Sequence, residues 1–185
     1  MLSATELKQQ ISSTIGKEKV AELTRILRKE NFALIDLINL SFYENKDIAF
    51  RAAWLLENVF LDSPLSYLPE IENLLKRLPD VTYPSCQRHY AKIIMHLTRP
   101  KAPLSIRQKM QQVDLEPIIE KLFDWLIDPK VKIAVKVFAA EALFNLRAQH
   151  NWITEELANE IEHLMRNGTA AIQSRGKKIL KALGK

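Results

Sequence analysis

The stretch from Leu115 to Leu146 carries two apolar patterns separated by a short polar corner. Apolar residues recur every three or four positions before the corner, at Leu115, Ile119, Leu122 and Leu126, and after it, at Val135, Phe138, Ala142 and Leu146. This spacing places each set on one face of an α-helix. Asp128-Pro129 ends the first helix, because the residue before proline disfavours helical backbone, and proline fits a first helical turn. The stretch therefore predicts a helix pair, with Pro129 in the first turn of the second helix.

The same plan of helix, corner and helix recurs along the chain. Asn167 and Gly168 predict a helix end, Thr169 a cap for the next helix, and Thr154 a helix start. Two more helices are expected ahead of the repeats, in "SATELKQQISSTI" and "KEKVAELTRILRKE", separated near Gly16. Further helix pairs are predicted at 32–42 and 47–61, 66–78 and 85–98, and 154–166 and 169–183.

The second helices of these pairs align with one another. Ala53, Ala91, Ala140 and Lys177 fall in one column, at separations of 38, 49 and 37 residues. The larger separation reflects residues 98–114, a proline-punctuated insertion with a short helix. Two-helix repeats of roughly 40–47 residues are typical of HEAT and armadillo proteins.

The segment 115–146 resembles a HEAT repeat in its apolar first helix, its "LIDP" corner and its Ala-Ala-x-Ala-Leu second helix. The resemblance extends over residues 31–183, and "RGKK" departs from it most. It implies an all-α fold, an α-α superhelix forming a right-handed solenoid of about four helix pairs. The expected organisation is one domain over residues 1–185, with capping helices at 1–30, repeats at 31–63, 64–98, 115–148 and 153–183, and an insertion at 99–114.

Four segments resemble a narrower family of small bacterial HEAT-like proteins of unassigned role: "RAAWLLENVF", "FDWLID", "WITEEL" and "SRGKKILK". Some members of that family are labelled adenylosuccinate lyase. The serine-rich signature loop of that lyase, similar to "SSxMPxKxNP", has no counterpart in this chain. A lyase is therefore the third hypothesis for the function.

Composition indicates a globular cytoplasmic protein. Hydrophobic residues make up 47% and charged residues 26% of the 185 positions, which argues against disorder. Cys86 is the only cysteine, so no internal disulfide is possible and a reducing compartment is expected. No apolar run approaches the length of a membrane span, and the first residues do not resemble a signal peptide.

The positive charge is concentrated near the C-terminal end. The formal net charge is +5, and residues 129–185 hold 10 Lys/Arg against 5 Asp/Glu. Second helices line the concave surface of a HEAT stack, so basic residues on them are candidates for binding phosphates. The alternative is a solvated polar face on a terminal repeat. The candidate residues are Arg88, Lys92, Lys132, Lys136, Arg175, Lys177, Lys178 and Lys181.

Other chemistry-bearing residues are expected to be structural or solvated. Cys86, His89 and His96 share a helix face, but His89 and His96 are about 10 Å apart along the axis, too far to share a metal. No metal or cofactor is therefore expected. His150 and His163 are expected at the surface, since neither lies in a recognisable nucleophile pattern.

Acidic and aromatic residues also admit two interpretations. Glu116, Glu120 and Asp124 form a stripe that is either solvated or a docking edge for a basic partner. Trp54 and Trp125 lie within apolar repeats and are expected to pack there. Trp152 is expected to pack onto the first turn of the helix that follows it.

The leading functional hypothesis is a non-enzymatic scaffold whose concave surface binds a protein or peptide. The alternative is nucleic-acid binding through the basic C-terminal repeats. The sequence leaves the identity of the partner and the oligomeric state open.

Overall fold

The computed structural model describes residues 2–185, which form eleven α-helices and two short 3₁₀ helices with no strand in that range. The chain divides into two compact units, Met1–Ile93 and Ile94–Lys185. Helix α6 (Pro84–Leu97) crosses the division. The predicted all-α helical-repeat fold class is confirmed.

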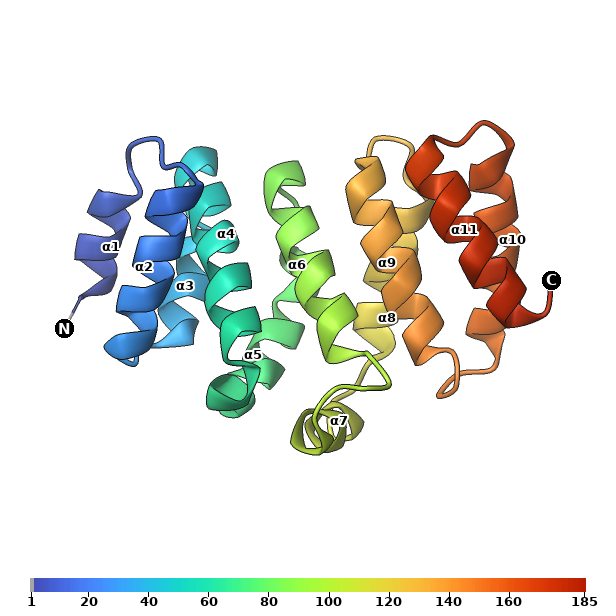
Figure 1. Ribbon diagram of the computed structural model, residues 1–185, viewed down its shortest axis with the longest axis horizontal. Helices are drawn as coiled ribbons and strands as arrows, with labels where there is room; N and C mark the ends of the chain where they lie inside the picture. Colours follow the sequence, from blue (N-terminus) through green and yellow to red (C-terminus); the bar gives the residue numbers. More distant parts are fainter. Residues whose placement is uncertain (1) are drawn as a thin grey trace. The chain divides into compact units, whose positions relative to one another are not determined.

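The first unit is built around α4, which packs against α2 and α3 (Figure 1). Asn45 caps α4, since its side chain accepts hydrogen bonds from the backbone N–H groups of Asp47 and Ile48. The helices that precede α6 in this unit are α1 (Ala4–Gln10), α2 (Lys17–Lys29), α3 (Leu34–Leu40), α4 (Lys46–Asp62) and α5 (Ile71–Lys76).

The helix predicted at 66–78 is not a single α-helix. It is divided into the 3₁₀ helix η1 (Pro64–Glu70), α5, and the 3₁₀ helix η2 (Leu78–Asp80). Pro69 lies inside η1 and supplies no N–H donor, and Tyr67 departs from helical geometry at φ −114° and ψ 23°. Proline removes the hydrogen bonds that would continue a helix through this segment.

The second unit is built around α9, which packs against α8, α10 and α11 (Figure 1). The side of α9 that faces these helices carries small and branched residues, including the buried Ala139, Ala140 and Leu143. Small side chains let helices approach closely. The helices of this unit after α6 are α7 (Leu104–Gln111), α8 (Glu116–Ile127), α9 (Ile133–Leu146), α10 (Trp152–Arg166) and α11 (Ala170–Leu183).

The corner between α8 and α9 corrects the prediction for Pro129. Asp128 accepts a hydrogen bond from the Lys130 N–H through its side chain, at 2.8 Å, and from the Val131 N–H through its carbonyl, at 3.1 Å. Pro129 therefore occupies the second position of a tight turn, where its fixed φ is favourable. It lies before α9, which begins only at Ile133.

The start of α10 and the corner before α11 also differ from expectation. Helix α10 begins at Trp152 rather than Thr154 and ends at Arg166. Thr169 occupies the N-cap position of α11 as predicted, but its side chain makes no capping hydrogen bond.

The alignment of α11 with the other second helices was wrong by one residue. Lys177 is exposed, whereas Gly176 is buried against α10. A Cβ atom at position 176 would overlap with Met165 Sδ and approach Ile161 Cγ2 to 3.1 Å. Gly176 therefore occupies the buried column that alanine fills in α4 and α9, and it allows α10 and α11 to pack closely.

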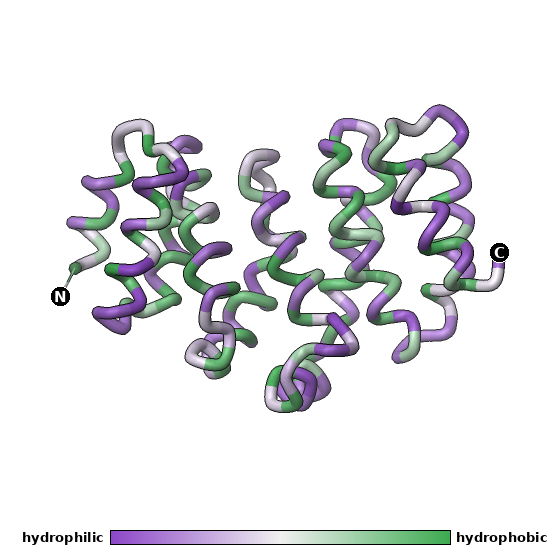
Figure 2. Tube along the Cα trace, viewed as in Figure 1, coloured by the Kyte–Doolittle hydropathy of each residue, from purple (hydrophilic) through white to green (hydrophobic). Residues whose placement is uncertain are grey.

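Hydrophobic and hydrophilic positions alternate along the helices of both units (Figure 2). Within residues 2–185, no helix combines the length and the apolar character needed to cross a membrane.

Candidate functional site

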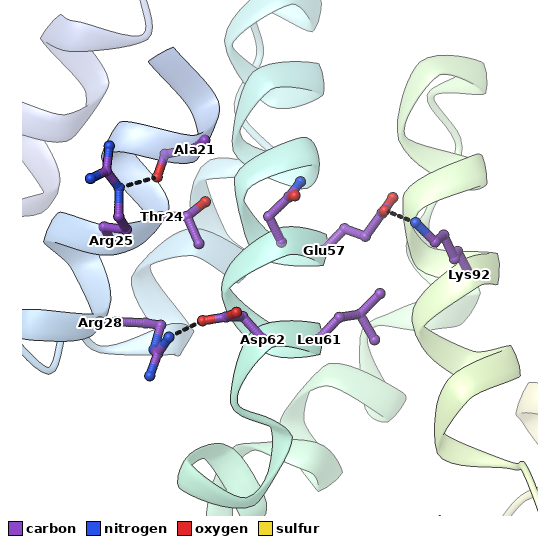
Figure 3. Close-up of a pocket in the computed structure, with 9 residues that line it drawn as sticks. Ala21, Thr24, Arg25, Arg28, Glu57, Leu61, Asp62 and Lys92 are labelled. Carbon is purple, nitrogen blue, oxygen red and sulfur yellow. Dashed lines mark hydrogen bonds and ion pairs between the residues drawn. The ribbon is translucent and has the colours of Figure 1, made fainter. Parts of the chain in front are cut away.

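An open groove of about 660 Å³ lies on the face of the first unit that α2, α4 and α6 form (Figure 3). We call it the α2–α4–α6 groove. It is lined by Ala21, Thr24, Arg25, Arg28, Glu57, Asn58, Leu61, Asp62 and Lys92.

Helical periodicity explains why these residues meet. The α2 contributors recur at intervals of three, one and three positions, which places them on one side of that helix. The α4 contributors, from Glu57 to Asp62, recur at intervals of one, three and one positions, which also places them on one side of their helix, and α6 adds Lys92. The groove is therefore built from one face of each helix.

Two ion pairs tie the groove together. Arg28 of α2 donates to the Asp62 carboxylate of α4, and Lys92 of α6 donates to Glu57 Oε1 (Figure 3). Glu57 Oε2 is also 2.7 Å from His89 Nδ1 of α6. Each of the two carboxylates in the groove is thus engaged by at least one basic side chain.

Glu57 is a buried carboxylate held in its charged form. Burial by itself would raise the pKa of this carboxyl, but the hydrogen bonds with His89 and Lys92 outweigh that effect and hold the pKa below its ordinary value. His89 is also buried, and its ring lies 5.5 Å from the Phe50 ring between centroids. The side chain of Glu57 therefore joins α4 to α6 through charge-assisted hydrogen bonds.

Glu57→Gln is expected to lower the free energy of unfolding by about 1–3 kcal/mol at pH 7.5, because an amide cannot accept from both His89 and Lys92. The folded-state pKa of Glu57 lies below the unfolded value, near 4.5. The contribution of Glu57 to the free energy of unfolding is therefore complete above pH 4.5, and it is lost as the pH falls through the folded-state pKa. Urea unfolding at a series of pH values should show the difference from wild type shrinking below pH 4.5.

The control is Glu22→Gln, which removes an exposed carboxylate 2.9 Å from Lys19 Nζ on the same helix. Exposed pairs of this kind contribute about 0.2–1 kcal/mol. Equal losses for the two variants at pH 7.5 would contradict the stabilising role of Glu57.

Two groups in the groove remain available for a ligand. Arg25 is exposed, and its Nε donates to the Ala21 carbonyl of its own helix at 3.5 Å; among the described residues it has no carboxylate partner. Asn58 Nδ2 donates to the Trp54 carbonyl at 2.8 Å, so its Oδ1 and second N–H can serve a partner.

The structure separates the predicted basic residues into several environments. Arg88, Lys132, Lys177, Lys178 and Lys181 are exposed, the last three on one face of α11. Lys92 is half-buried and pairs with Glu57. Arg175 pairs with Glu141 of α9 at 2.7 Å, and Lys136 is buried, donating from Nζ to the Leu126 carbonyl. The expectation that Lys136 extends an exposed basic surface is therefore corrected, because its side chain is buried and its ammonium caps the C-terminal end of α8.

Cys86, His89 and His96 lie in three different environments. Cys86 is buried, and its thiol donates to the Ser41 carbonyl at 3.8 Å. Burial raises the pKa of this thiol to about 11. His89 pairs with Glu57, and His96 is half-buried. Across residues 2–185, no three His, Cys, Asp or Glu side chains lie close enough to hold a metal ion.

The acidic stripe of α8, the other two histidines and Trp125 are also assigned an environment from the sequence. Glu116, Glu120 and Asp124 are all exposed, and His163 is exposed while His150 is half-buried. Trp125 is buried in the second unit, as expected.

The other two tryptophans lie closer to the surface. Trp54 is half-buried and stacks on Phe50 at 6.0 Å between ring centroids. Trp152 is 46% exposed and stacks on Phe123 of α8 at 5.5 Å, rather than packing on the first turn of its own helix.

Sequence reasoning misses the contribution of α2 to the groove, because it assigns residues 1–30 only a capping role. The spacing of Arg25 and Arg28 relative to Ala21 was visible in the sequence. The signal that was lacking is the contact of α2 with α4.

A family model described as HEAT repeat domain matches residues 7–183. The chain belongs to the HEAT repeat domain family. No curated protein and no solved structure matches it. In this HEAT repeat domain the matched region begins within α1, so it includes the helix that completes the α2–α4–α6 groove.

Proposed function

We propose that this HEAT repeat domain is a non-enzymatic, cytoplasmic protein-binding module whose α2–α4–α6 groove binds an extended, acidic segment of a partner protein. The observation that carries the proposal is the pairing pattern in the groove. Its two carboxylates are engaged, while Arg25 and Asn58 keep hydrogen-bonding groups available.

The amide of Asn58 suits a peptide backbone. An extended segment offers one N–H and one C=O at each residue, and a side-chain amide can accept from the first and donate to the second. The hydrogen bond from Nδ2 to the Trp54 carbonyl fixes the orientation of this amide on α4. Preorganisation of this kind lowers the cost of binding.

The charge of the groove supports an acidic partner. Its lining holds three basic residues (Arg25, Arg28, Lys92) and two acidic ones (Glu57, Asp62), so one positive charge is left over. That charge belongs to Arg25, whose guanidinium can bind a carboxylate through two parallel hydrogen bonds. Leu61 and Ala21 add apolar surface for the rest of the segment.

The same pairing pattern favours binding over catalysis. General acid–base chemistry needs a carboxylate or histidine within reach of a substrate proton. Here Glu57 and His89 are buried against each other, and Asp62 is paired with Arg28. These groups are engaged in holding α2, α4 and α6 together.

Nucleic-acid binding is the second candidate, supported by the exposed lysines of α11. Lys177, Lys178 and Lys181 share one face, and no acidic residue occurs from Thr169 to Lys185. Contacts from three lysines to phosphates would give a log–log salt slope of about −2.7.

One binding assay separates the two candidates. Peptides of twelve residues are selected from a random display library on the purified protein, and their affinities are measured by fluorescence anisotropy. Selected peptides should carry Asp or Glu, and Arg25→Glu or Asn58→Ala should weaken them by about tenfold or more, the effect of losing a charge-assisted or buried hydrogen bond. Duplex DNA and RNA serve as parallel probes.

The control is Arg107→Glu, since Arg107 is also exposed and also donates from Nε to a carbonyl of its own segment, Ala102, at 3.2 Å. Its affinity for the peptides should equal that of wild type. Peptide binding that survives Arg25→Glu would contradict the groove proposal. Nucleic-acid binding that is lost on neutralising Lys177, Lys178 and Lys181 would favour the second candidate.

A further inference from the structure

A second pocket, of about 490 Å³, lies at one end of the Ile94–Lys185 unit and shares no residue with the α2–α4–α6 groove. We call it the α9–α11 pocket. Three of its lining residues are basic and none is acidic. It is lined by Pro129, Val131, Ile133, Lys136, His163, Leu164, Arg166, Asn167, Gly168, Thr169 and Ile172.

Helices α9 and α11 both begin at this pocket. They run in the same direction, as second helices of successive repeats do, so their N-terminal ends lie at the same end of the unit (Figure 1). Neither N-cap residue, Lys132 or Thr169, makes a side-chain capping bond. The first-turn N–H groups of both helices therefore lack side-chain caps, and both helix dipoles place positive potential at this end.

The decisive feature is Lys136, which is only 2% exposed yet lines the pocket. Its Nζ donates to the Leu126 carbonyl at 2.5 Å, which uses one of three donors. In the described part of the chain no carboxylate forms an ion pair with it. Asp128 and Glu160 act on it only through longer-range electrostatics, and neither lines the pocket.

A buried ammonium without a counter-ion is unfavourable. Burial lowers the pKa of Lys136, which is the expected response to this environment. An anion in the pocket would supply the missing charge. Arg166 and His163 are exposed, and neither is engaged in an ion pair among the described residues, so their donors are available to the same anion.

We propose that the α9–α11 pocket binds a phosphate-class anion, either inorganic phosphate or the phosphoryl group of a small phosphomonoester. Lys136 supplies the buried charge, Arg166 binds two oxygens, and the N-terminal N–H groups of α11 bind a third. Such an arrangement suits an anion whose oxygens point in several directions more than a planar carboxylate. A pocket of 490 Å³ lies within the usual range for small ligands.

The test is calorimetric titration of the full chain with inorganic phosphate, phenyl phosphate and acetate in a low-salt buffer at pH 7.5. Wild type should bind inorganic phosphate or phenyl phosphate saturably at one site, and its melting temperature should rise with that probe. Arg166→Gln should weaken binding by about tenfold or more, the usual loss for one charge-assisted hydrogen bond. Lys136→Met should weaken it at least as much.

Arg166 is exposed at the end of α10, so Arg166→Gln should have the same melting temperature as wild type when no ligand is present. This variant therefore tests the proposal even if Lys136→Met does not fold. The matched control is Lys178→Gln, on the exposed face of α11 outside the pocket, which should bind like wild type. Tighter binding of phenyl phosphate than of inorganic phosphate would identify a phosphomonoester as the ligand, and the reverse would identify free phosphate. The proposal is overturned if neither phosphate probe binds saturably, if acetate binds as tightly, or if Arg166→Gln and Lys178→Gln have equal effects.

Discussion

Leu143→Ala should lower the free energy of unfolding by about 2–5 kcal/mol, the range measured for leucines deleted from well-packed cores. Leu143 is 0% exposed and lies in the last turn of α9, the helix that packs against α8, α10 and α11. Removing its side chain leaves a cavity that the surrounding structure closes only in part. Urea unfolding followed by far-UV circular dichroism at 222 nm measures the loss.

The matched control is Leu104→Ala, the same substitution at a position that is 61% exposed at the start of α7. Little apolar area is buried there and alanine is a good helix former, so the change should stay within about 0.5 kcal/mol. A loss below about 0.5 kcal/mol at Leu143 as well would mean that α9 does not form the core of the second unit.

The burial of Leu143 was predictable because helical periodicity depends only on positions along one segment. Ala140 and Leu143 are three positions apart and apolar, so they lie on the same side of a helix whatever that helix packs against. The same reasoning failed one helix later, where it placed Lys177 in the buried column that Gly176 occupies. Alanine and leucine are apolar, so their burial can be predicted from residue type. The burial of Gly176 follows from its close approach to Met165, which is visible only in the packed structure.

The corners were the least predictable part of the fold, because local hydrogen bonds decide them. Pro129 is compatible with a first helical turn and with the second position of a tight turn. The side chain of Asp128 selects the turn by accepting from the Lys130 N–H. In the same way, Pro69 permits a 3₁₀ segment where apolar spacing alone predicted an α-helix.

The candidate site was only partly visible in the sequence. The charged residues can be read from the sequence, but the ion pairs that define the groove join residues far apart along the chain. Arg28 and Asp62 are 34 residues apart. Glu57 lies 32 residues before His89 and 35 residues before Lys92. From the sequence alone, Lys92 and Lys136 are equivalent, because both are basic residues predicted on second helices. Packing distinguishes them, since Lys92 lies beside a carboxylate and Lys136 lies beside a helix end.

Arg51→Met should lower the free energy of unfolding by about 2–4 kcal/mol, because it removes two charged hydrogen bonds from a buried site. Arg51 lies on α4, and its guanidinium donates to the carbonyls of Ile11 and Ser12, each at 3.0 Å. These carbonyls lie just beyond the C-terminal end of α1. Helix α1 has 7 residues, too few to be stable alone, so its order depends on such contacts.

The effect should be strongest in α1, which makes it separable from a general loss of stability. Native-state hydrogen exchange should show the α1 amides losing protection in Arg51→Met while those of α9 keep it. Arg166→Met is the control, since Arg166 is exposed and forms no ion pair among the described residues, and it should change neither quantity. Equal protection of α1 in wild type and Arg51→Met would show that the apolar contacts of Leu7 and Ile11 hold this helix without the guanidinium. Because methionine preserves most of the apolar length of the arginine side chain, a loss confined to α1 would be assigned to the two hydrogen bonds rather than to packing.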